Sequence, residues 1–140
     1  MEIKMFSAPD AKVLIVDDTQ TNLRVARNLL FPYDIIADLC TSGIDAIEML
    51  KNAHYDLVFM DYKMPIMDGV EATRNLRAMG VDNAYYRNLP IVALTTYNVT
   101  GAREMFLENG FNDFMLKPID TVKLNAVLEH WIPKNKQKRH

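Results

Sequence analysis

Short apolar runs recur along the 140 residues of the chain, and segments with helical spacing separate them. Five runs stand out: Val13–Val16, residues 35–39, Leu57–Met60, Ile91–Leu94 and Phe114–Leu116. Most of them are rich in β-branched residues, and short continuous runs are typical of strands that are covered on both faces in a parallel sheet. The pattern therefore predicts five strands.

A helical stripe follows each run. The stripes extend from Leu23 to Leu30, from Ser42 to about Asn52, over residues 69–79, from Val99 to Phe106, and from Leu124 to Trp131. Asp68 with Glu71 resembles a capping box at the start of the third helix, and Gly110 ends the fourth. This alternation predicts an α/β fold, in which a parallel sheet lies between two layers of helices.

Polar side chains gather at the predicted carboxyl ends of four strands. They are Asp17, Asp18, Asp61, Thr95 and Lys117. Any one of the acids can cap the helix that follows it. Three acids, a hydroxyl and a lysine at one edge exceed what capping requires, and ligands of such sheets bind beyond the carboxyl ends of the strands.

Asp17, Asp18 and Asp61 converge on one pocket if the first and third strands are neighbours. Close carboxylates repel each other, and a hard cation such as Mg²⁺ removes this repulsion. Mg²⁺ in such surroundings bridges a carboxylate and a phosphoryl group, while Lys117 and Thr95 suit the other phosphoryl oxygens.

Asp61 is the candidate nucleophile of this pocket. The loop Lys63–Pro65 follows it and leaves its side chain open, and a carboxylate can attack phosphorus to form an aspartyl-phosphate. The spacing of the polar residues therefore predicts reversible phosphorylation of an aspartate.

The composition is that of an ordinary globular domain, with 49% hydrophobic and 24% charged residues. The balance of 16 Lys and Arg against 18 Asp and Glu argues against a nucleic-acid-binding surface over the whole chain. The single Cys40 excludes an intramolecular disulfide framework, and no apolar run reaches the roughly 20 residues that span a bilayer. We expect a cytoplasmic domain over residues 12–132, a polar lead-in over 1–11 and a basic tail over 133–140.

Four motifs resemble the receiver domain of two-component response regulators. In chain order they are Val16–Asp18, Met60–Gly69, Ala93–Thr95 and Leu116–Pro118. The resemblance extends from about Lys12 to Trp131. It implies a flavodoxin-like (βα)5 three-layer sandwich with strand order 2-1-3-4-5, and transfer of phosphate to Asp61 from a phosphohistidine on a partner.

The resemblance also implies roles for individual residues. Asp18, Asp61 and the backbone carbonyl of Lys63 are expected to bind Mg²⁺, and Asp17 to reach it through water. Lys117 and Thr95 are expected to hold phosphoryl oxygens.

A switch and a cis peptide bond follow from the same resemblance. Thr95 and Phe114 are the expected switch pair, and the Lys117–Pro118 peptide is expected to be cis. Three residues beside the site are predicted to modulate the reaction: Lys63, Thr96 and Tyr97. Phe114 stands where tyrosine is common in relatives, and Thr96 where a very small residue is usual.

The expected partner is a histidine kinase or a histidine phosphotransfer domain, with no direct contact to nucleic acid or membrane. The stretches Met67–Thr73, Phe111–Phe114 and Trp131–Lys134 resemble the C-terminal receiver of hybrid sensor histidine kinases, whose parent protein can be membrane-anchored. The fourth helix, the fifth strand and the fifth helix are the expected output surface, which also allows a weak homodimer. The isolated chain is not expected to be an enzyme.

Other classes with similar features fit the sequence less well. A haloacid-dehalogenase phosphatase carries a second aspartate where Lys63 stands, and a flavodoxin needs a Ser-, Thr- and Gly-rich phosphate loop where Asp17–Thr19 stands. The glycine fingerprints of Rossmann and P-loop proteins are absent from the sequence. A stand-alone single-domain response regulator and a non-phosphorylated interaction module of the same fold remain alternatives.

Overall fold

The computed structural model describes residues 6–139, and a five-stranded parallel sheet forms its centre. The strands are β2 (Val13–Val16), β3 (Asp38–Cys40), β4 (Leu57–Asp61), β5 (Ile91–Thr95) and β6 (Asp113–Leu116). Their order across the sheet is β3-β2-β4-β5-β6, and all neighbours are parallel. Counted along the chain, this is the predicted order 2-1-3-4-5, and the flavodoxin-like fold is confirmed.

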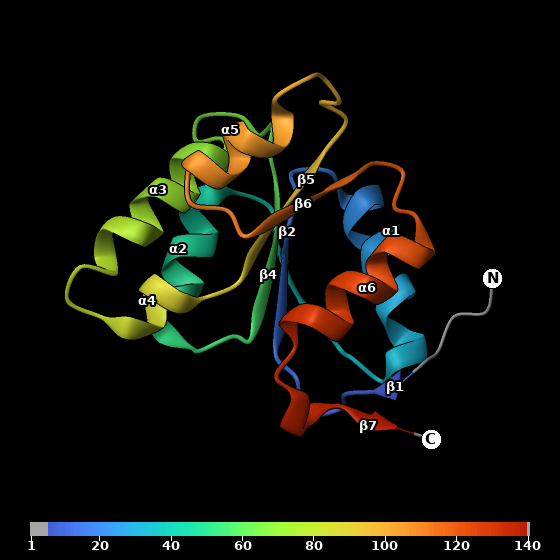
Figure 1. The fold of residues 1–140 in the computed structure, drawn as a ribbon. Helices are drawn as coiled ribbons and strands as arrows, with labels where there is room; N and C mark the ends of the chain where they lie inside the picture. The colour runs from blue at the N-terminus through green and yellow to red at the C-terminus, as the bar shows by residue number, and fades with distance from the viewer. Residues whose placement is uncertain (1–5, 140) are drawn as a thin grey trace.

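Helices cover both faces of the sheet (Figure 1). One layer contains α1 (Gln20–Leu30) and α6 (Thr121–Trp131), and the other contains α2 (Gly43–Asn52), α3 (Gly69–Met79), α4 (Ala84–Asn88) and α5 (Ala102–Glu108). Successive side chains of a strand point to opposite faces, so Ile15 packs in one hydrophobic cluster and Leu14 in the other. Since both faces are covered, the strands carry continuous apolar runs.

Local signals in the sequence set most helix boundaries. The Ser42 hydroxyl accepts a hydrogen bond from the Asp45 N–H at 3.0 Å, and the Asp68 carboxylate accepts one from the Glu71 N–H at 2.8 Å. The predicted cap at Asp68 is therefore confirmed, and Ser42, where the second helix was expected to start, is also an N-cap. The fourth predicted helix is shorter than expected. Val99, where the helical stripe was expected to start, lies before α5 and is half exposed.

The second predicted strand begins three residues too early. The apolar run starts at residue 35, but β3 includes only Asp38–Cys40. α1 is followed directly by the 3₁₀ turn η1 (Phe31–Tyr33), and Asp34 after it has a positive φ of 59°. The Ile35 N–H still donates a hydrogen bond to the Leu30 carbonyl of α1, so residue 35 belongs to the helix end and not to the strand. β3 pairs with β2 only from Leu14 onward.

The chain ends described by the structure pair with each other, at the opposite end of the sheet from the carboxyl ends of β4 and β5 (Figure 1). β1 (Phe6–Ser7) and β7 (Lys138–Arg139) form an antiparallel pair after the 3₁₀ turn η2 (Lys134–Lys136). Phe6 is 1% exposed, and the Arg139 guanidinium lies 5.0 Å from its ring centroid. The expected polar lead-in is thus wrong for Phe6–Ala8, which are buried, and Lys138 and Arg139 of the basic tail pair with this segment. Residues 1–5 and 140, which belong to these two predicted segments, lie outside the described residues.

The connection before β5 contains the extra helix α4, which packs onto the domain. The Tyr86 hydroxyl donates to the Leu50 carbonyl at 3.1 Å, and the half-buried Arg77 donates to the carbonyls of Tyr86 and Gly110 at 2.8 Å each. Burial lowers the pKa of Arg77, whose hydrogen-bond acceptors are carbonyl oxygens. This network joins α3, α4 and the approach to β6. None of the helices within residues 6–139 is long and apolar enough to cross a membrane.

Candidate functional site

The predicted polar residues meet at the carboxyl edge of the sheet. Asp61 is the last residue of β4, Thr95 is the last residue of β5, and Lys117 follows β6. Asp17 and Asp18 follow β2, which pairs with β4. A carboxylate oxygen of each of the three acids lies within 4.8 Å of the others, and this group could hold a metal ion.

Lys117 connects two of the three acids. Its Nζ donates to Asp61 Oδ1 at 2.7 Å and to Asp17 Oδ2 at 2.9 Å. Asp61 is 5% exposed and Asp17 is 1% exposed, whereas Asp18 is exposed. The site therefore has two buried carboxylates that share one ammonium group, and a third carboxylate that faces solvent.

The charges of this group are not balanced. Burial raises the pKa of Asp61 to about 6, the neighbouring Asp17 and Asp18 add to this shift, and Lys117 opposes it. Burial lowers the pKa of Lys117, but its hydrogen bonds to Asp61 and Asp17 outweigh burial and leave that pKa raised. With all groups ionised, three carboxylates and one ammonium leave two negative charges, which a divalent cation would neutralise.

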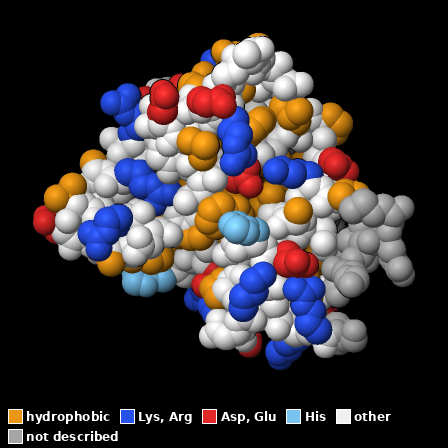
Figure 2. Space-filling model, in the orientation of Figure 1, with side chains coloured by type: hydrophobic (Ala, Val, Ile, Leu, Met, Phe, Trp, Pro, Cys, Tyr) orange, Lys and Arg blue, Asp and Glu red, His pale blue; other side chains and the backbone are white. Residues whose placement is uncertain are grey.

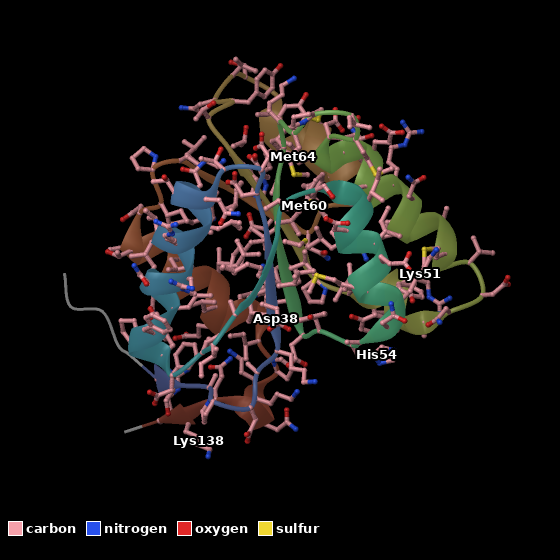
Figure 3. The ribbon with its side chains drawn as sticks, turned by 180° about the vertical axis from the view of Figure 1, so that it is seen from behind. Asp38, Lys51, His54, Met60, Met64 and Lys138 are labelled. Carbon is pink, nitrogen blue, oxygen red and sulfur yellow. The ribbon has the colours of Figure 1, made fainter. Side chains whose placement is uncertain are left out.

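The loop after Asp61 packs closely against the Asp61 backbone. The Gly69 N–H donates to the Tyr62 carbonyl at 2.8 Å, and a Cβ at Gly69 would lie 2.2 Å from the backbone oxygen of Asp61. Only glycine permits this close approach. Figure 3 shows Met64 of this loop above Met60 of β4, and both side chains are buried.

Thr95 lies buried beside the acids, at 3% exposure. Its hydroxyl accepts a hydrogen bond from the Tyr97 N–H at 2.8 Å, and its carbonyl accepts one from the Lys117 N–H at 2.8 Å. Thr96 and Tyr97 are exposed next to it. The Lys117–Pro118 peptide is cis, as the resemblance implied.

Phe114 is half buried on β6, with its ring 5.7 Å from that of Phe106 and 27° from parallel to it. The fully buried Phe106 also contacts Tyr62 edge-on, at 5.2 Å between ring centroids. Tyr62 was not among the candidate residues. The only signal for Tyr62 in the sequence is its position directly after Asp61. The periodicity of the sequence does not show which aromatic ring Tyr62 contacts.

Comparisons with known proteins agree with this geometry. The family model of the response regulator receiver domain matches residues 13–129. The chain is 37% identical to two-component response regulator 24 of Arabidopsis thaliana, covering 82% of this chain and 79% of that protein. It is 31% identical to histidine kinase 5 of the same plant, covering 94% of this chain but only 16% of the kinase.

Solved structures show the same architecture. The receiver domain of the sensor histidine kinase PA1611 from Pseudomonas aeruginosa, solved with magnesium in its active site cleft, matches with a TM-score of 0.76 and 33% identity over 86% of this chain and 96% of that one. A co-crystal structure of the Saccharomyces cerevisiae phosphotransfer protein Ypd1 with the Ssk1 receiver domain matches with a TM-score of 0.79 and 26% identity, covering 94% and 91% of the two chains. With the family model matching most of its length, the chain belongs to the response regulator receiver domain family and is a receiver domain of a two-component phosphorelay.

Proposed function

We propose that the chain accepts a phosphoryl group on Asp61 from a phosphohistidine of a partner protein. The observation that carries the proposal is the placement of Asp61 at the end of β4, with an ammonium group 2.7 Å away and two further carboxylates beside it. This arrangement combines a nucleophile, a cation for a phosphoryl oxygen and ligands for a metal ion at one edge of the sheet.

The donor set fits Mg²⁺, a hard cation that prefers oxygen ligands and few carboxylates. Asp18, Asp61 and the Lys63 carbonyl would hold the ion, with Asp17 acting through water. The similar PA1611 receiver contains magnesium in its active site cleft. When bound, Mg²⁺ would neutralise charge on the transferring phosphoryl group.

The transfer itself exchanges one bond for another. A carboxylate oxygen of Asp61 forms a bond to phosphorus, the bond from phosphorus to the partner's histidine nitrogen breaks, and that nitrogen keeps the electron pair. Lys117 is already within hydrogen-bond distance of Asp61, so its ammonium can donate to a phosphoryl oxygen. The Thr95 hydroxyl, which now accepts from Tyr97, still has its own proton to donate to another.

The phosphoryl group would switch the surface of α5, β6 and α6. It adds about −1.5 to −2 charges and strong acceptors, which favour a movement of Thr95 toward it. Phe114 then turns into the space beside β6. We propose that this surface contacts the downstream partner and also forms a weak homodimer.

We also propose that the isolated chain acts as a self-phosphorylating signalling domain rather than an enzyme.

The partner is proposed to be a histidine kinase or a histidine phosphotransfer domain, as in the Ypd1–Ssk1 co-crystal structure. On the face that Figure 2 shows, Lys and Arg side chains are interspersed with Asp and Glu, which supports a protein partner over nucleic acid. The chain spans a small part of the histidine kinases that it matches, 16% of one and 5% of another, and the second is a hybrid signal transduction histidine kinase. Origin from a hybrid sensor histidine kinase in the cytoplasm is our preferred context, and a stand-alone regulator is the alternative.

A small phosphodonor tests the proposed function directly. The chain is incubated with acetyl phosphate and Mg²⁺ and then weighed intact. We expect a gain of one phosphate in the wild type and in Asp82→Asn, a matched change of an exposed acid, but not in Asp61→Asn. An unmodified wild type would favour a non-phosphorylated interaction module.

A further inference from the structure

The Lys63 ammonium lies on an aromatic ring beside the phosphoacceptor. Its Nζ is 4.4 Å from the ring centroid of Tyr62, well within the distance at which an ammonium is attracted to the face of an aromatic ring. The Lys63 side chain is exposed, and among the residues that the structure describes it takes part in no salt bridge. The ring is therefore the partner that determines where this ammonium lies.

The Tyr62 ring is held by the core and not by the lysine. It contacts the fully buried Phe106 edge-on at 5.2 Å and the Tyr97 ring at 5.8 Å. Its backbone is also fixed, because the Tyr62 N–H donates to the Leu94 carbonyl at 2.9 Å. The ring thus offers a stationary site for a mobile cation.

Phosphorylation of Asp61 would create a competitor for this cation. Lys63 is two residues from Asp61, and a phosphoryl group there carries about −1.5 to −2 charges. One ammonium cannot bind the Tyr62 ring and the phosphoryl oxygens equally at once. The strength of the ring contact therefore sets how often Lys63 lies over the phosphoryl group.

We propose that Tyr62 is a positioning residue that shortens the lifetime of the aspartyl-phosphate by retaining Lys63 on its ring. In hydrolysis, a water oxygen forms a bond to phosphorus, the bond from phosphorus to the Asp61 oxygen breaks, and the carboxylate keeps the electron pair while a proton of the water passes to solvent. Water must approach phosphorus in line with the leaving oxygen. A lysine bound over the phosphoryl group obstructs that approach, whereas a lysine on the ring leaves it open. This inference rests on the proposed phosphorylation of Asp61.

Three variants separate the ring contact from a general role of Tyr62 in packing. Tyr62→Phe keeps the ring, Tyr62→Leu removes it, and Lys63→Gln removes the charge. Each protein is phosphorylated with acetyl phosphate and Mg²⁺, the donor is removed, and the decay is followed by intact mass. We expect Tyr62→Leu to lengthen the half-life about two- to fivefold, the range that a surface cation–π contact allows, and Tyr62→Phe to keep the wild-type half-life.

The double variant decides whether the effect passes through the lysine. In the Lys63→Gln background, Tyr62→Leu is expected to have no further effect on the half-life. A Tyr62→Leu half-life equal to or shorter than that of the wild type overturns the inference, and so does an effect of the same size in the Lys63→Gln background. If the wild type gains no phosphate at all, the proposed function fails together with this inference.

A second measurement needs neither metal nor phosphate. In the unphosphorylated, metal-free protein, the ring current of Tyr62 should shift the Lys63 Cε protons upfield in NMR spectra. The shift is expected to persist in Tyr62→Phe and to vanish in Tyr62→Leu. Equal Lys63 shifts in the wild type and Tyr62→Leu would overturn the placement of the ammonium, whatever the outcome of the phosphorylation test.

Discussion

Lys117 donates a hydrogen bond to Asp61 at 2.7 Å across 56 residues of sequence, and the same ammonium group reaches Asp17 at 2.9 Å. Two buried carboxylates therefore share one ammonium group. Since the three groups are in contact, a change in any of them alters the charge of the other two.

The stability of the metal-free protein should fall as pH rises from about 4 to about 6. The pKa of Asp61 is about 6 in the folded protein and has an ordinary value of 3.8, so in this range the folded state binds more protons than the unfolded state. Asp61→Asn should remove this decline and be more stable at pH 7.5 by about 1–3 kcal/mol. Urea denaturation with EDTA across this pH range measures it. If the decline in stability persists in Asp61→Asn, or also disappears in Asp82→Asn, it does not arise from the Asp61 carboxyl group.

Lys117→Met should destabilise the metal-free protein at pH 7.5 by about 2–4 kcal/mol, because it leaves two buried carboxylates without their cation. The loss should be smaller at pH 5, where Asp61 is largely protonated. Lys123→Met on α6 is the matched control, since its side chain is 45% exposed and its ion pair with Asp113 is long, at 3.7 Å. Thermal unfolding of both variants at the two pH values checks this. Equal losses for the two lysines would show that Lys117 does not balance the buried charge.

Asp18→Asn should weaken binding of Mg²⁺ by about tenfold or more, because it removes one of few protein carboxylate ligands. The exposed position of Asp18 means that the fold itself should tolerate the change. Titration of Mg²⁺ followed by the rise in unfolding temperature measures the affinity. Asp82→Asn should bind as the wild type does, and unchanged binding by Asp18→Asn would remove this residue from the metal site.

Gly69→Ala should destabilise the protein by about 2 kcal/mol or more, because the new Cβ would meet the Asp61 carbonyl oxygen at 2.2 Å. Gly101→Ala provides the comparison: nothing lies within 4 Å of its Cβ position, but its φ is +87°. That variant should lose only about 1 kcal/mol from backbone strain. Urea denaturation of both proteins ranks them, and the reverse order would mean that the loop moves away from Asp61 at little cost.

Local signals in the sequence determined most of the elements. The apolar runs, the caps at Ser42 and Asp68 and the stop at Gly110 predicted strands and helices that the structure contains. These signals work because they depend on periodicity and on hydrogen bonds between residues a few positions apart. The strand predicted from residue 35 starts too early, because an apolar run does not show which of its residues pair with a neighbouring strand. Only residues 38–40 pair with β2.

Sequence also determined which residues form the candidate site, since alternating strands and helices bring the carboxyl ends of all strands to one edge. Only the tertiary structure decided their distances. The register of β2 against β4 places the carboxylates of Asp17 and Asp61 close enough to share Lys117. The pairing of Phe6 with Arg139 and the contact of Tyr62 with Phe106 also lie beyond sequence patterns. Such contacts join residues far apart in the chain, and their geometry is set by the packing of the whole domain rather than by any local preference.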